Sequence, residues 1–363
     1  FDLAQKYVYL TAKAYDYETG LLASDPAAGD AFLKQVIGAR ALGVFDAAGN
    51  PVVGGSVGDP GLADIMARME GNWLVLKTRL GINNPQAYAT WFSLRQELFR
   101  ILPGPQGDSA WQTELAKYWV EDLLTLPEYR RYCQPFQAIN GLQAKEPGLV
   151  IPFSSVIDFA RNFFGNDLAG EDSALDSTYF ATKIAAAGVF FDGYNEKLNG
   201  YTGTAPFALT PTVYLIPIGD DRMRAPGLAD GTALSFRVVD QVIPLPYTVG
   251  GTHLNDPDWI PLYDGYTGGV DLAARIRKYP SFRPSFGAGG PHNGQLDCPR
   301  LVGRSAWNTR WLLIIPAGTL NANRDDALQT FIRGKDANRD GLTDLSGVTD
   351  IRLGLRTYSH SGN

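Results

Sequence analysis

The residues best suited to chemistry form an acidic segment near the end of the chain, between residues 336 and 344. Its side-chain oxygens stand at alternate positions, and a backbone carbonyl could complete a ligand set of Asp336, Asn338, Asp340, Leu342 and Asp344. Calcium binds roughly six to eight hard oxygen ligands, and Gly341 permits the sharp turn that such a loop needs. Gly347 stands where an EF-hand has a bidentate glutamate, and Asp350 is a nearby substitute. The spacing predicts a structural calcium site, and the alternative is an unliganded Asp/Asn turn.

A second candidate is the segment Gly54–Gly58, which matches the G-x-S-x-G pattern of a nucleophile elbow at Ser56. A serine nucleophile needs a base and an oxyanion hole, and the elbow normally lies within a series of β/α units. The histidines, His253, His292 and His360, are expected in loops or at the chain end. A glycine-rich connector is the favoured interpretation, and a serine hydrolase is an alternative.

A third candidate combines aromatic and acidic residues. Trp259 follows Asp256 and Asp258, and Tyr263 and Tyr266 come shortly after it. Exposed rings could form a platform for a sugar, and paired carboxylates serve glycoside hydrolysis. Aromatic residues in long loops also pack the loop against the protein, so ligand binding by Trp259, Tyr263 and Tyr266 stays an alternative.

The composition indicates a folded protein and argues against two kinds of partner. The 363 residues are 45% hydrophobic and 19% charged, with a net charge of −6. Nucleic-acid binding needs a basic surface, so no such partner is expected. No segment approaches the ~18–20 apolar residues of a membrane-spanning helix. Cys133 and Cys298 could pair or remain buried thiols. The sequence begins at Phe1 without a methionine or signal peptide, so we expect a processed product or a piece of a longer protein.

The periodicity of apolar residues changes along the chain. Helical spacing predicts helices at Asp2–Gly20, Ala31–Gly43, Gly61–Leu80, Pro85–Leu102 and Ser109–Leu126. Short β-rich runs predict strands at Leu149–Pro152, Lys183–Phe191, Thr212–Ile218, Leu234–Ile243, Trp307–Ile315 and Val348–Thr357. Their irregular spacing and long loops favour a sandwich. We therefore predict an α+β fold, with a helical region at residues 1–145 and a β-sandwich with long loops and the calcium-type loop at 146–363.

The order of these elements resembles the C-terminal part of the A component of bacterial Tc toxin complexes. The resemblance rests on the segments 14–18, 37–40, 70–77, 92–96, 151–159, 182–189, 310–316 and 348–358, and best on Ser93–Gln96 and the last two strands. In that family, helices of a translocation channel run back into a β-sandwich that receives the B component. The helices here are far shorter than a channel shaft, and the calcium-type and Trp259 loops look like additions. The calcium-type loop itself resembles those of dockerins and thrombospondin-type repeats.

The resemblance implies a protein that is secreted or on the cell surface. Our hypothesis is a non-enzymatic C-terminal structural and partner-docking region of a large secreted Tc-toxin-like bacterial protein. The expected partners are another protein, other parts of a larger parent chain, or further copies in a homo-oligomer, and the expected cofactor is structural calcium. The alternatives are a calcium-stabilised surface adhesion or carbohydrate-binding module and a serine hydrolase at Ser56.

Overall fold

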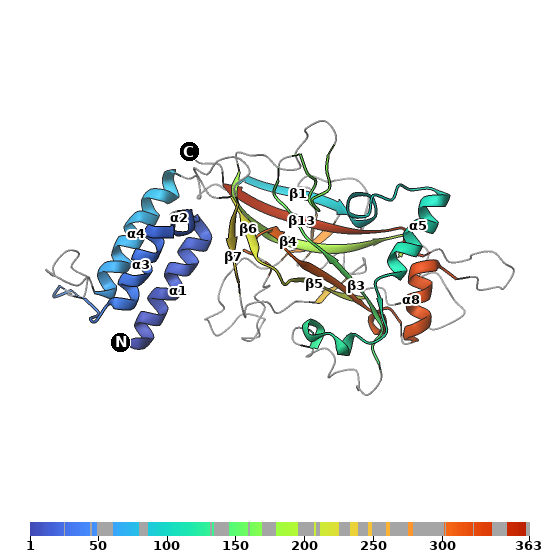
Figure 1. Cartoon of the computed structure of the whole chain (residues 1–363), viewed down its shortest axis with the longest axis horizontal. Helices are drawn as coiled ribbons and strands as arrows, with labels where there is room; N and C mark the ends of the chain where they lie inside the picture. The colour runs from blue at the N-terminus through green and yellow to red at the C-terminus, as the bar shows by residue number, and fades with distance from the viewer. Residues whose placement is uncertain are drawn as a thin grey trace.

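The computed structural model describes residues 1–24, 26–43, 46–48, 61–79, 86–130, 133, 145–158, 160–168, 179–194, 207, 211–224, 233–238, 246–248, 259–261, 275–278, 301, 303–321, 323–335 and 347–360. Within these residues, a small N-terminal helical unit lies beside a larger β-rich body (Figure 1).

The helical unit consists of helices packed around a small apolar core. Its described helices are α1 (Asp2–Thr19), α2 (Leu21–Ser24), α3 (Pro26–Gly38) and α4 (Leu62–Arg79). Val8 of α1, Val36 of α3 and Ile65 of α4 meet in this core. Helix α1 ends at Gly20, whose left-handed backbone (φ 69°) lets its N–H bond to Asp16 O at 2.6 Å. A glycine adopts this conformation without steric cost, which fixes the end of α1.

The β-rich body is an antiparallel sandwich. One sheet has the strand order β1-β13-β4-β10-β9, the second β2-β3-β12-β5-β8, and a small third sheet β11-β6-β7. The strands are β1 (Gln86–Ser93), β2 (Trp119–Val120), β3 (Gly148–Phe153), β4 (Phe180–Asp192), β5 (Thr212–Pro217), β6 (Asp221–Met223), β7 (Leu234–Phe236), β8 (Pro246–Thr248), β9 (Trp259–Pro261), β10 (Arg275–Lys278), β11 (Trp307–Asn308), β12 (Trp311–Pro316) and β13 (Asp350–His360).

Strand β12 is buried on both sides because alternate residues of a strand point to opposite faces. Trp311, Leu313 and Ile315 belong to the main core, which also holds inward side chains of β4 and β13 from the other five-stranded sheet. Leu312 and Ile314 face a second core, which the segment around residues 120–133 covers. The apolar run that predicted this strand is therefore continuous because both of its faces are buried.

Short helices close one end of the sandwich. These are α5 (Pro105–Ala116), α7 (Ala317–Leu320) and α8 (Arg324–Arg333), with a π-helical turn at Leu94–Leu98 and a 3₁₀ turn at Leu123–Thr125. Trp111 of α5 is buried, and its indole N–H donates to the Val348 carbonyl at 2.9 Å. This bond fastens α5 next to the start of β13.

The prediction of an α+β fold, with helices first and strands after them, is confirmed. The predicted helix at Pro85–Leu102 is wrong, because Gln86–Ser93 pairs with β13 along its whole length. Tyr88, Thr90 and Phe92 alternate with the residues between them, and packing against a distant strand overrides the helical pattern. The sheets therefore take in residues on both sides of the predicted boundary at 145.

The last two long strands belong to different sheets. Strand β12 lies in one five-stranded sheet and β13 in the other. Helices α7 and α8 come between them in the chain. Among the described helices, none has the length and apolar character needed to cross a membrane.

Candidate functional site: a buried polar junction and an exposed helix face

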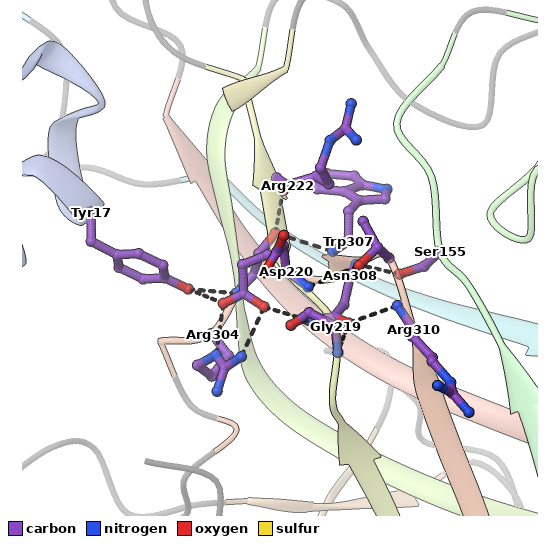
Figure 2. Close-up of polar contacts among 12 residues, drawn as sticks. Tyr17, Ser155, Gly219, Asp220, Arg222, Arg304, Trp307, Asn308 and Arg310 are labelled. Atoms are coloured by element: carbon purple, nitrogen blue, oxygen red, sulfur yellow. Dashed lines mark hydrogen bonds and ion pairs between the residues drawn. The ribbon is translucent and has the colours of Figure 1, made fainter. Parts of the chain in front are cut away.

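The most densely connected polar groups lie where α1 meets the β-rich body. Asp221 of β6 is fully buried, and its carboxylate accepts hydrogen bonds from three side chains. Arg304 donates two, at 2.7 and 3.0 Å, while the Asn308 amide donates one at 2.8 Å and the Tyr17 hydroxyl one at 2.7 Å. A carboxylate has about four lone-pair sites, so these bonds use the acceptor capacity of Asp221. We call Tyr17, Asp221, Arg304 and Asn308 the polar junction (Figure 2).

The Tyr17 hydroxyl joins α1 to two β segments at once. It donates to Asp221 and accepts from the Ser305 backbone N–H at 2.9 Å. Figure 2 shows Tyr17 reaching from its helix toward Arg304. Burial and the neighbouring Asp221 raise the pKa of Tyr17 well above its ordinary value, so the hydroxyl keeps its proton and remains a donor. The Tyr17 ring also meets Phe236 of β7 edge-on, with 5.5 Å between ring centroids.

Arg304 stays charged in spite of its burial. Burial disfavours the charged guanidinium, but the hydrogen bonds and the charge of Asp221 outweigh that effect and raise the pKa of Arg304. The two-bond pairing with Asp221 uses the planar geometry of the guanidinium. A buried ion pair of this kind is costly to break, because the remaining partner is left as an uncompensated charge.

The polar junction extends inward through Asn308 and Ser155. The side-chain amide oxygen of Asn308 accepts hydrogen bonds from the backbone N–H groups of Gly219 and Arg310, at 3.0 and 2.9 Å. The Ser155 hydroxyl accepts from the Asn308 backbone N–H and the Trp311 indole N–H, both at 2.8 Å. These bonds tie the turn before β6 to β11 and β12, so the Tyr17 contact reaches the centre of the sandwich.

A second buried cation lies beside the polar junction. Lys183 of β4 is fully buried, and its ammonium lies 2.5 Å from the Glu18 carboxylate and 4.9 Å from the centre of the Tyr17 ring. Burial lowers the pKa of Lys183, while the charge of Glu18 acts in the opposite direction. Two consecutive residues of α1, Tyr17 and Glu18, therefore contact the same cation of the β-rich body.

His360, at the end of β13, is buried close to this ion pair. Burial and the charge of Lys183 lower the pKa of His360, and Glu18 partly opposes them. The folded protein therefore holds His360 neutral at pH values where an unfolded histidine, with a pKa of about 6.5, takes up a proton. Proton uptake favours the unfolded chain, so stability is lost as the pH falls through about 6.5.

The face of α1 that points away from its small core is apolar and exposed. Leu3, Tyr7 and Leu10 have 65%, 61% and 49% of their surface exposed, and Ala14 is exposed as well. The intervals between these residues are four, three and four, the spacing of a coiled-coil seam. We call Leu3, Tyr7, Leu10 and Ala14 the α1 seam. The next residue in the same series is Tyr17, which belongs to the polar junction.

Most residues of the predicted sites lie outside the described part of the chain. This holds for the whole calcium-type loop, Asp336–Asp344, for Ser56, and for Tyr263 and Tyr266 with their acidic neighbours. The backbone of Trp259 begins the short strand β9, and nothing is described of its side chain. The calcium site, the serine nucleophile and the aromatic platform all stay predictions. Within the described ranges, no cluster of three or more His, Cys, Asp or Glu side chains is arranged to hold a metal ion.

Asp350, which the sequence offered as a substitute calcium ligand, joins two segments of the β-rich body by hydrogen bonds. Its carboxylate accepts from the Ser93 hydroxyl at 2.6 Å and from the Arg95 backbone N–H at 3.1 Å. The Ser93–Gln96 segment and the last strand, which supply the best parts of the family resemblance, are therefore in direct contact. Burial raises the pKa of Asp350, and the hydrogen bond from Ser93 opposes that rise.

Cys133 is buried in the second core, and burial raises the pKa of its thiol. Its proposed partner Cys298 lies beyond the described residues, so the disulfide stays a prediction. Comparison of the chain with protein-family models, with curated proteins and with solved structures gave no match.

The sequence contains only weak signals for the site residues that were not predicted from it. Lys183 begins an otherwise apolar predicted strand, and a charged residue in a buried strand needs a partner. The α1 seam was also visible as a spacing of four, three and four. Nothing local links Tyr17 to Asp221 or to Ser305, which lie 204 and 288 residues further along the chain.

Proposed function

We propose that this chain is a non-enzymatic structural and partner-docking region of a large secreted Tc-toxin-like bacterial protein. We further propose that docking uses the α1 seam, and that the occupant is the same seam of a second copy. The observation that supports this proposal is the row of exposed apolar residues at coiled-coil spacing along α1. A helix with such a row is expected to bury it against another helix.

The helical unit leaves much of its apolar surface uncovered. Its core is small, whereas Ile37 of α3 and both Leu74 and Val75 of α4 are more than half exposed, in addition to the α1 seam. Contiguous apolar surface on a water-exposed unit favours a protein-protein contact. A second copy is the occupant of choice because its α1 has the same length and the same seam, so knobs of one helix meet holes of the other.

The polar junction supports this proposal by fixing how α1 is presented. Tyr17 and Glu18 anchor the C-terminal turn of α1 to the β-rich body, and the α1 seam runs from there to the N-terminal end of the helix. A docking helix that is held in advance loses less conformational freedom on association than a free one. The β-sandwich thus acts as a support for the docking helix.

The test compares the mass in solution of the wild-type chain with that of Tyr7→Glu, by light scattering coupled to size-exclusion chromatography. We expect the wild type to form a species at a multiple of 39.5 kDa. Tyr7→Glu places a charge in the α1 seam and should give the monomer, because burying an unpaired charge is unfavourable.

The matched control is Leu102→Glu. Leu102 is 74% exposed, more than any residue of the α1 seam, and lies in the segment between β1 and α5. This variant should keep the wild-type mass. A monomeric wild type at every concentration, or equal dissociation by both variants, would contradict docking between copies through the α1 seam.

A further inference from the structure

A cavity of about 270 Å³ lies against one face of the sheet formed by β1, β13 and β4. Its walls include Tyr88 and Thr90 of β1, Thr357 and Ser359 of β13, and Thr182 of β4. Thr357 pairs with Tyr88 across the strands, so their side chains share one face. Lys183, the next residue after Thr182, points to the other face and toward α1. The cavity is therefore separate from the polar junction and from the α1 seam.

The polar groups that described residues contribute to this cavity are neutral, and several have unused hydrogen-bonding capacity. The hydroxyls of Thr182 and Ser359 bond to each other at 2.7 Å. One hydrogen is enough for that bond, so the pair retains a second O–H to donate. The hydroxyls of Thr90 and Thr357 have no hydrogen-bond partner among the described residues.

The buried side chain of Trp307 also lies in the cavity wall. This residue is a member of the cavity wall and is only 2% exposed, yet its indole N–H has no acceptor among the residues that the structure places. A buried donor without an acceptor costs about 1–3 kcal/mol. The wall therefore favours a ligand that exchanges hydrogen bonds with hydroxyl groups, and the Trp307 side chain lies against it as part of the wall.

Aromatic side chains form much of the remaining wall. The rings of Phe92 and Phe163 stack with 3.9 Å between centroids and 17° between planes. The hydroxyls of Tyr88 and Tyr179 meet at 2.5 Å, and Tyr88 is 44% exposed. None of the described residues in the wall has an acidic or basic side chain. A charged ligand would lose its hydration without gaining a counter-charge.

We propose that this cavity binds one neutral, polyhydroxylated ring, either a free monosaccharide or the terminal sugar of a glycan. The hydroxyls of the wall match the donors and acceptors around such a ring, and the aromatic side chains match its apolar C–H groups. The volume is below the ~300–1,000 Å³ of sites for drug-sized ligands, which suits a single ring. The residues of this site are different from the predicted set Trp259, Tyr263 and Tyr266, and the site does not depend on docking through the α1 seam.

The experiment follows the indole N–H signal of Trp307 by NMR in the full ¹⁵N-labelled chain, assigned with Trp307→Phe. The probes are glucose, galactose and N-acetylglucosamine, with glucuronate as the charged control. At least one neutral sugar should shift the Trp307 signal with saturation and a Kd of about 1 mM or below. Glucuronate should bind at least about tenfold more weakly, because its charge has no partner in the wall.

Variants assign the shift to the cavity. Thr357→Val keeps the shape of the side chain and removes one hydroxyl, which should weaken binding about two- to tenfold. Thr113→Val, an exposed threonine of α5, is the matched control and should leave the Kd unchanged. Equal affinities of Thr357→Val and the wild type would overturn the proposal, as would equal binding of glucuronate or the lack of a saturable shift with every neutral sugar.

The methyl glycoside of the best sugar separates the two sources of the ligand. If the glycoside binds as tightly as the free sugar, the anomeric oxygen faces the opening and the terminal sugar of a glycan is the ligand. If only the free sugar binds, the ligand is a monosaccharide. Both results support the cavity as a sugar site.

Discussion

Replacing Tyr17 with phenylalanine removes one oxygen atom from the polar junction and leaves the ring in place. The lost hydroxyl donates to the Asp221 carboxylate at 2.7 Å and accepts from the Ser305 N–H at 2.9 Å. A hydrogen bond to a charged group contributes about 1.5–3 kcal/mol, and Ser305 is fully buried, so its N–H is left without this acceptor. We therefore expect Tyr17→Phe to reduce the free energy that holds α1 on the β-rich body by about 1.5–3 kcal/mol.

Hydrogen exchange of the α1 amides measures this free energy directly. Local opening of a segment exposes its amides, and a change of 1.4 kcal/mol alters their protection about tenfold. Tyr17→Phe should lower the protection of Asp2–Thr19 by about 10- to 100-fold and leave β12 unaffected. Thr11→Val is the matched control, because Thr11 is an exposed residue of the same helix outside the α1 seam and its hydroxyl bonds within α1, to the Tyr7 carbonyl at 2.8 Å. It should show wild-type protection.

Two results would refute this reasoning. Equal protection of α1 in Tyr17→Phe and Thr11→Val would mean that the polar junction does not hold the helix. A uniform loss of protection over α1 and β12 would mean that the two parts unfold as one unit, and that the junction stabilises the whole chain instead of the placement of α1.

Three further predictions concern other parts of the chain. Asp221→Ala should reduce the free energy of unfolding by about 3–5 kcal/mol in urea denaturation, because it leaves the Arg304 guanidinium buried without its partner, whereas Asp221→Leu combined with Arg304→Met should cost clearly less. Between pH 7.5 and about 5.5, the wild type should lose stability relative to His360→Gln, because only the unfolded wild-type chain protonates His360 near pH 6.5; parallel curves would contradict the buried neutral histidine. Calcium should raise the melting temperature relative to a chelator if the loop Asp336–Asp344 binds the ion, and Asp340→Ala should abolish that rise; an unchanged melting temperature would exclude a native calcium site.

The sequence predicted the elements whose pattern is local. Strand β12 was recognisable because its apolar run ends at Pro316, and β4 because of its continuous apolar residues. Helix α1 was recognisable from helical spacing that stops at Gly20. In each case, the pattern of neighbouring residues indicates the same secondary structure that long-range packing requires.

Features made by distant residues could not be predicted in the same way. Gln86–Ser93 has apolar residues that suit a helix, and it becomes a strand because β13, more than 250 residues later, offers a matching edge. The polar junction combines residues from three separate segments, so no motif in one segment predicts it. The exposure of the α1 seam is likewise a property of the folded helical unit, since spacing alone does not say which apolar face is covered.

Chemical cross-linking of Leu10→Cys tests the docking proposal most directly. Leu10 is near the middle of α1, so two copies bring this position together whether their helices run parallel or antiparallel. Helices packed through a seam lie about 8–10 Å apart. A short bismaleimide should therefore join Leu10→Cys copies efficiently and leave Leu102→Cys largely unlinked, although Leu102 is the more exposed residue. Equal cross-linking of the two variants, or none at Leu10→Cys, would contradict docking through the α1 seam.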